Sequence, residues 1–152
     1  MKYLLMIGAL ASIDLKLKAQ IDKQDEAGFP RPLAHTNGKI MLYRHHNAGF
    51  PFGFLQKYGM IVRMVPLAMV SGLTGVLGYF LTKPGRKLEK FSLALILGGA
   101  LSNLYDRFVH HYVVDYFSFQ FGVLKKVIFN IGDLCVFLGT GIWMFLELFR
   151  KS

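Results

Sequence analysis

Residues 60–82 read MIVRMVPLAMVSGLTGVLGYFLT, a run of 23 residues with one charged side chain, Arg63. An α-helix needs about 20 mostly apolar residues to cross the hydrocarbon core of a bilayer. Arg63 stands near the start of the run, where a long side chain can reach the membrane interface. This stretch predicts a membrane-spanning helix.

Two later segments extend the pattern. Residues 127–149 (VIFNIGDLCVFLGTGIWMFLELF) match the first run in length and carry Glu147 near their end. Residues 88–105 have a shorter apolar part, but Gly98 and Gly99 belong to a face of small side chains. Such faces allow membrane helices to pack closely, so we expect this segment to be a span as well.

The N-terminal segment, residues 2–18, has the shortest apolar run and could pass for a cleavable signal peptide. We expect it to remain attached as the first span, because Asp14 and Lys18 stand one helical turn apart in the favourable order, acid first. The sequence therefore predicts an all-α membrane protein, a four-transmembrane-helix bundle forming one domain over residues 1–152, with spans at about 2–18, 60–82, 88–105 and 127–149.

The charge distribution agrees with a membrane location. Apolar residues make up 53% of the chain and charged residues 18%, below the roughly 25% typical of soluble domains. The formal net charge is +9, and cations cluster in the connector 83–90 and at Arg150 and Lys151, as the positive-inside rule predicts for cytoplasmic segments. We expect membrane lipids as partners and no nucleic acid, which would call for basic residues interleaved with aromatic ones on one exposed face.

The segments 19–59 and 106–126 then share the extracytoplasmic side. Within the first of them, residues 39–46 (KIMLYRHH) are β-prone and are bounded by turn-forming Asn37-Gly38 and Asn47. We expect a small extracytoplasmic β-containing segment there.

Three carboxylates fall near that same membrane face. Asp106 follows the third span, Asp115 lies in the loop after it, and Asp133 lies about one turn inside the fourth span. An acid near the hydrocarbon is costly and suggests a function. For Asp133 alone, the alternative is that it only complements the positive N-terminal end of its helix.

Helical spacing places amides and a guanidinium beside these acids. Asn103, Asp106 and Arg107 stand at i, i+3 and i+4, and Asn130 and Asp133 stand at i and i+3. The two groups could form an interhelical polar clamp or jointly hold a substrate. Two neighbouring carboxyl groups that share a proton could also act as base and acid, which is the chemistry of aspartic proteases.

Other catalytic and metal sites find less support. Cys135 is the single cysteine and excludes an intrachain disulfide or a Cys-rich metal site. The adjacent pairs at residues 45–46 and 110–111 are histidines, but adjacent side chains point apart and chelate poorly. We expect no metal and no cofactor.

Five short motifs, taken in order, resemble those of the lipoprotein signal peptidase (signal peptidase II) family, bacterial membrane aspartic peptidases. They are residues 14–18 (DLKLK), 47–53 (NAGFPFG), 98–107 (GGALSNLYDR), 113–117 (VVDYF) and 129–133 (FNIGD). The chain departs from the family pattern at Ser102, where the family has glycine, at Gly132, where it has alanine, and at Pro51.

The resemblance implies a function and a set of roles. The substrates would be diacylglyceryl-modified prolipoproteins, hydrolysed before the lipid-modified cysteine at the extracytoplasmic face of the bacterial cytoplasmic (inner) membrane. Asp115 and Asp133 would be the catalytic dyad. Asp106 would orient Arg107, and Asp14 and Lys18 would pair to hold the first span. The remaining supporting or substrate-binding residues would be Asn47, Gly49, Asn103 and Asn130.

Two other functions remain open from the sequence. One is a catalytically impaired membrane paralogue that binds lipidated peptides. The other is a small transporter whose aspartates carry protons, although the inverted repeats and broken helices typical of that class are not evident.

Overall fold

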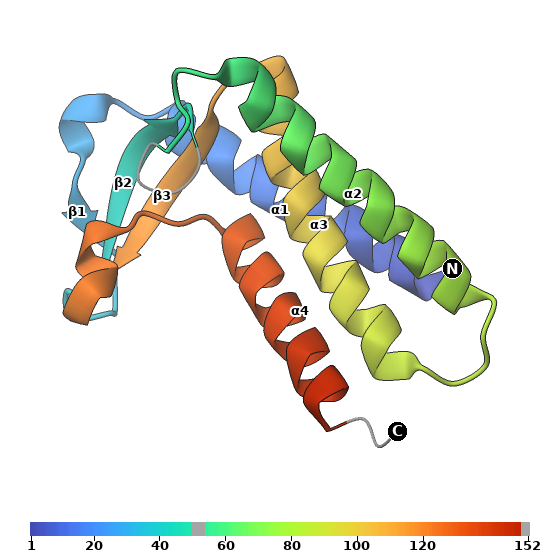
Figure 1. Cartoon of the computed structure of the whole chain (residues 1–152). Helices are drawn as coiled ribbons and strands as arrows, with labels where there is room; N and C mark the ends of the chain where they lie inside the picture. The colour runs from blue at the N-terminus through green and yellow to red at the C-terminus, as the bar shows by residue number, and fades with distance from the viewer. Residues whose placement is uncertain (50–53, 150–152) are drawn as a thin grey trace.

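The computed structural model describes residues 1–49 and 54–149. Four α-helices account for most of this part: α1 (Lys2–Asp22), α2 (Gly59–Leu81), α3 (Lys87–Val109) and α4 (Ile131–Leu148). Three strands, β1 (Arg31–Pro32), β2 (Ile40–Asn47) and β3 (Val113–Phe119), and two 3₁₀ turns, η1 (Glu26–Gly28) and η3 (Gly122–Lys126), complete it. Figure 1 shows the helices side by side and the strands gathered beyond one end of them, where α1 ends and α4 begins.

Two of the helices are long and apolar enough to cross a bilayer. These are α2 and α4, with 23 and 18 residues. Only 17% of an 18-residue apolar stretch in each helix is buried within the protein. Large apolar side chains such as Met69 and Phe145 are exposed. The two helices therefore present to their surroundings a surface suited to lipid, in agreement with the apolar runs of the sequence.

Three predicted spans differ from the observed helices by four residues at one end, because α1 continues to Asp22, α3 continues to Val109 and α4 begins late. The predicted fourth span begins at residue 127, but α4 begins at Ile131, because Asn130 is extended and its side chain accepts a hydrogen bond from the Asp133 amide. This is an N-cap, and it ends the helix on that side. Residues 127–130 lead into the helix instead, and Phe129 pairs with Phe117 of β3.

Helix α3 lies at the centre and packs against the other three. Its glycines allow this: a Cβ at Gly98 would lie 2.8 Å from Leu10 of α1, and a Cβ at Gly99 only 2.1 Å from the carbonyl oxygen of Gly132 at the start of α4. Farther along, a Cβ at Gly139 would lie 2.7 Å from the Ser92 carbonyl oxygen. The predicted close packing on the small-residue face of the third span is thus confirmed.

The three strands form an antiparallel sheet in the order β1-β2-β3. The strand predicted at 39–46 is confirmed as β2. The expectation of a loop after the third span is wrong at 113–119, where residues VVDYFSF form β3. Apolar side chains of this strand, including Val114 and Phe117, pack with Ile21 and Phe129 into a core beneath the sheet. The pairing of β3 with β2 places Asp115 opposite His45 and Val113 opposite Asn47.

The close approach of α3 and α4 at Gly99 should make the stability of the protein sensitive to a larger side chain there. Replacing Gly99 with alanine places a methyl group against the Gly132 carbonyl, which neither backbone can avoid without moving. We expect Gly99→Ala to destabilise the protein by about 1–3 kcal/mol, as overpacked cores do, and to lower the thermal unfolding midpoint. Gly141→Ala is the matched control on α4, because nothing lies within 4 Å of a Cβ there. Equal midpoints for the two variants would contradict the packing described here.

Candidate active site

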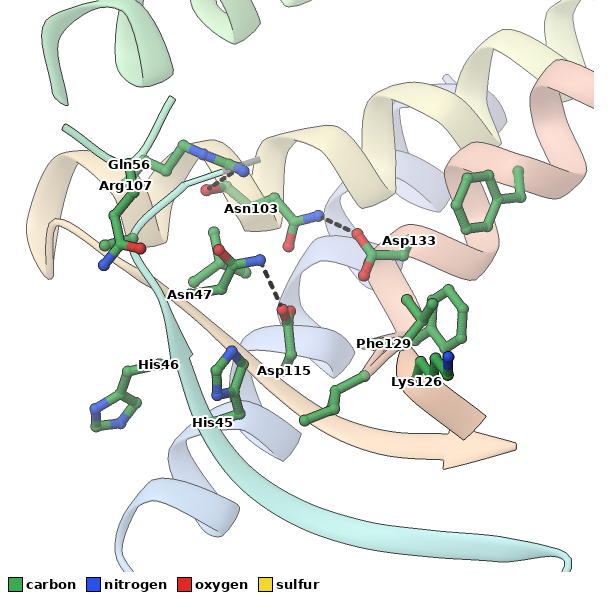
Figure 2. A pocket seen from close by; sticks show the side chains of 15 residues that line it. His45, His46, Asn47, Gln56, Asn103, Arg107, Asp115, Lys126, Phe129 and Asp133 are labelled. Atoms are coloured by element: carbon green, nitrogen blue, oxygen red, sulfur yellow. Dashed lines mark hydrogen bonds between the residues drawn. The ribbon is translucent and has the colours of Figure 1, made fainter. Parts of the chain in front are cut away.

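Asp115 and Asp133 line one pocket of about 610 Å³ at the junction of the sheet and the helices. Asp115 comes from β3 and Asp133 from the first turn of α4, and Figure 2 shows both side chains directed into the same space. Asn103 and Arg107 of α3 and Asn47 of β2 line it as well. The structure thus brings together residues that four separate sequence motifs contribute.

Asp115 is held by two amide side chains. Its Oδ1 accepts a hydrogen bond from Asn130 Nδ2 at 2.7 Å, and its Oδ2 accepts one from Asn47 Nδ2 at 3.1 Å. The residue is 4% exposed. Burial, with a further contribution from the negative charge of Asp133, raises the pKa of Asp115 to about 7. This carboxyl group can therefore hold a proton near neutral pH.

Asp133 is fixed by the start of its own helix and by α3. Its Oδ2 accepts a hydrogen bond from the Asn130 amide at 3.1 Å, while Asn130 Oδ1 accepts one from the Asp133 amide at 2.8 Å, which is a capping box. Its Oδ1 accepts a hydrogen bond from Asn103 Nδ2 at 2.9 Å. Asp133 therefore does complement its helix terminus, as the alternative interpretation held, and it also faces the pocket. Asn130 joins the two aspartates because it binds both.

Behind Asn103 lies a buried ion cluster around Lys18. The Lys18 ammonium, in a residue only 2% exposed, lies 2.9 Å from Asp14 Oδ2 and 3.1 Å from Asp106 Oδ2. It also donates to Asn103 Oδ1 at 2.7 Å. The predicted pairing of Asp14 and Lys18 is confirmed, and through Asn103 the cluster is one hydrogen bond away from Asp133.

Two hydroxyl groups complete this cluster. Ser102 Oγ donates to Asp14 Oδ2 at 2.5 Å and accepts from Lys18 at 2.9 Å, and the Tyr116 hydroxyl donates to Asp14 Oδ1 at 3.1 Å. A Cβ at Gly132 would lie 2.9 Å from the same Asp14 Oδ2. Ser102 and Gly132, two of the departures from the family pattern, therefore both lie beside Asp14 Oδ2. The serine adds a hydroxyl group that binds this oxygen, and the glycine lacks the methyl group that would crowd it.

Asp106 and Arg107 have different hydrogen-bond partners, because consecutive residues on a helix do not face each other. The orienting role of Asp106 toward Arg107 stays a prediction. Asp106 turns toward α1, where it binds Lys18, and also accepts from His110 at 3.2 Å and from the Val114 amide at 3.4 Å. Arg107 turns toward the pocket, where Nη1 donates to the Asn103 carbonyl at 3.4 Å and Nη2 to the Gly49 carbonyl at 3.3 Å.

The segment that follows Asn47 is described only in part. The Gly49 amide donates to Asn47 Oδ1 at 3.0 Å, which orients the asparagine whose Nδ2 binds Asp115. Residues 50–53 of the same motif, including Pro51, lie outside the described residues, as do the predicted cytoplasmic cations Arg150 and Lys151.

The paired histidines diverge, as their adjacency predicts. His110 Nδ1 lies 3.2 Å from Asp106, whereas His111 Nδ1 lies 3.2 Å from Arg63 of α2. In the other pair, His46 binds Asp22 at 2.6 Å. In residues 1–49 and 54–149, no three His, Cys, Asp or Glu side chains gather in a way that could hold a metal ion.

The sequence assigns no role to several residues of the site, one of which, Tyr116, lies within the motif at 113–117. Tyr116 lies beside Asp115 on β3 with its hydroxyl in the ion cluster, and only the burial of an aromatic residue in the sheet would hint at this role. The pocket lining also includes His45, Gln56 and Lys126. These three residues come together only through the fold.

Comparison with known proteins gives consistent findings. The sequence model of the family described as signal peptidase (SPase) II matches residues 6–149. A lipoprotein signal peptidase of Pasteurella multocida is 38% identical over 113 residues, 69% of this chain and 64% of that protein. One of Xylella fastidiosa is 31% identical over 140 residues, 91% of this chain and 83% of that protein. The alignment with the Pasteurella protein thus spans less than two thirds of that protein's length.

Two solved structures, both described as bacterial membrane enzymes, share the fold. Each has a TM-score of 0.81 and covers 99% of this chain, with 21% and 20% sequence identity and 93% and 94% of the other chain covered. At this level of identity the likeness concerns the fold.

We expect the Lys18 cluster to contribute to the stability of the protein. Lys18→Met leaves the carboxylates of Asp14 and Asp106 buried without their cation, and breaking a buried ion pair in this way costs about 3–5 kcal/mol. We expect a large fall in the thermal unfolding midpoint. The matched control is Lys16→Met, because Lys16 is exposed on the same helix. A midpoint for Lys18→Met that equals that of the control would show that the cluster does not stabilise the bundle.

Proposed function

The chain belongs to the signal peptidase (SPase) II family, and from that premise we propose that it is an aspartic endopeptidase that removes signal peptides from diacylglyceryl-modified prolipoproteins. It would hydrolyse the peptide bond before the lipid-modified cysteine. The observation that carries this proposal is the placement of Asp115 and Asp133 in one pocket, both hydrogen-bonded to Asn130. These aspartates favour an active enzyme over an impaired paralogue.

The geometry and the pKa of Asp115 suggest a division of roles. A pKa of about 7 lets Asp115 carry the proton of the pair near neutral pH, and we assign the ionised role to Asp133. Asp133 accepts a proton from a water molecule whose oxygen attacks the carbonyl carbon, while Asp115 gives its proton to the carbonyl oxygen. The tetrahedral intermediate collapses when its C–N bond breaks. Asp133 passes its proton to the leaving nitrogen, and Asp115 recovers a proton from a hydroxyl group of the intermediate.

The surrounding residues act as positioning residues in this proposal. Asn130, Asn47 and Asn103 each donate an amide hydrogen to an aspartate of the pair, and so hold the carboxylate oxygens in place. Arg107 links α3 to the Gly49 carbonyl at the pocket edge, where its charge can meet substrate carbonyls. Asp14, Lys18 and Asp106 support the site from behind through Asn103.

We further propose that all four helices cross the cytoplasmic (inner) membrane of a bacterium, as one domain over residues 1–152. Helices α1 and α3 carry more charge than α2 and α4, but the Lys18 cluster neutralises part of it inside the bundle. The connector between α2 and α3 holds Lys83 and Arg86, and Lys87 begins α3, as expected for cations on the cytoplasmic side. The sheet lies at the other end of the helices in Figure 1, and with the pocket beside it would face the extracytoplasmic side.

Substitution of the dyad tests the proposed chemistry. Asp115→Asn and Asp133→Asn preserve size but remove a carboxyl group, so each should lower kcat for cleavage of a lipid-modified precursor by purified protein by about 10⁴-fold. The double variant should be no worse than either single one, because groups that act as a unit fail together. Substrate binding should persist in all three.

Substantial turnover by either single variant, in an assay free of other peptidases, would remove that residue from the mechanism. Asp25→Asn is a suitable control, because Asp25 lies in the turn that begins η1, outside the pocket.

The raised pKa of Asp115 predicts the pH dependence. A group with a pKa of about 7 is protonated below that pH and loses its proton as the pH rises. The acid form is required, so kcat/KM should fall above about pH 7, approaching tenfold per pH unit. A profile of kcat/KM between pH 5 and 9 measures this, and a value that stays constant from pH 6.5 to 9 would contradict the role of Asp115 as the acid.

A further inference from the structure

The mouth of the pocket carries basic side chains from two elements. His45 and His46 come from the end of β2, and Lys126 comes from the last residue of η3, just before the chain turns into α4. We call these three residues the pocket rim. In Figure 2 the two histidines lie on the β2 side of the pocket and Lys126 on the α4 side.

Two of the three rim residues contribute little positive charge at neutral pH. His46 is paired with Asp22 at 2.6 Å and stacks on Tyr112 with ring centroids 4.0 Å apart. The pKa of His45 is lowered by partial burial and by the neighbouring His46, so this imidazole is neutral at pH 7.

Lys126 is different. Its side chain is exposed, and none of the carboxylates in residues 1–49 and 54–149 forms an ion pair with it. Lys126 is therefore the permanent cation of the rim.

The carboxylates of the pocket do not pair with this cation. Asp115 and Asp133 are held by the side-chain amides of Asn47, Asn103 and Asn130 and by the Asn130 backbone amide. Lys126 therefore places a positive charge at the mouth of the pocket. An exposed cation at the edge of a concave site selects ligands by charge.

The position of the rim says which part of a substrate it meets, if the proposed function holds. The rim belongs to the sheet and to η3, beyond the ends of the helices in Figure 1 and so on the water side. The lipid of the modified cysteine stays in the bilayer, and the signal peptide lies along the helices. The chain that follows the cysteine must leave past the rim to reach water.

We propose that Lys126 is a specificity-determining residue that favours precursors with an acidic side chain at the second or third position after the start of the mature chain, and disfavours those with a basic one. The interaction is a solvent-exposed charge pair with Asp or Glu, and a repulsion with Lys or Arg. This inference rests on the proposed function and adds a substrate preference to it.

The test compares two lipid-modified precursors that differ only at those two positions, one with aspartates and one with lysines. Exposed charge pairs are weak, so we expect kcat/KM for the acidic precursor to exceed that for the basic one by about three- to fivefold at low ionic strength. The ratio should approach one in 0.5 M salt, where the Debye length falls to roughly 4 Å.

Neighbouring lysines supply the matched variants. Lys126→Gln should bring the ratio at low salt close to one, whereas Lys125→Gln should leave it unchanged, because Lys125 is exposed beside Lys126 but does not line the pocket. Equal cleavage of both precursors by the unmodified protein, or an equal effect of the two substitutions, would overturn the inference while leaving the proposed function intact. Failure to cleave either precursor would overturn the proposed function and this inference with it.

Discussion

The rest of the structure depends on the ion pairs that the buried Lys18 ammonium forms with Asp14 of α1 and Asp106 of α3. Both ion pairs lie inside the bundle, and the ammonium group also donates to Asn103, which in turn donates to Asp133. A buried charge is tolerated only when it is paired and fully hydrogen-bonded, and here Ser102 completes the set. The same contacts therefore join the helices and aim a carboxylate at the pocket.

A second constraint comes from the sheet. The pairing of β2 with β3 places Asn47 near Asp115, and the N-cap of α4 places Asn130 between Asp115 and Asp133. The carboxylates thus approach each other from a strand and from a helix start, each restrained by amides. Repulsion between them, together with burial, keeps a proton on the pair near neutral pH, which is the condition for acid and base to coexist in one site.

Much of this arrangement could be predicted from the sequence, because apolar runs and helical spacing are local properties. The four helices, the strand at 39–46 and the pairing of Asp14 with Lys18 follow from such patterns. The pairing of Asp106 with Lys18 could not be predicted, because the two residues lie on different helices far apart in the sequence. Strand β3, and the positions of Tyr116 and Lys126, depend on long-range pairing that a single sequence does not reveal.

We propose that this pocket hydrolyses one bond in a lipid-modified substrate. The most direct measurement is mass spectrometry of the products formed when the purified protein, in lipid vesicles, meets a precursor with and without the diacylglyceryl group. The account predicts two fragments from the modified precursor, the larger beginning at the lipid-bearing cysteine, and an intact unmodified precursor. An uncut modified precursor, or a cut at another bond, would contradict it.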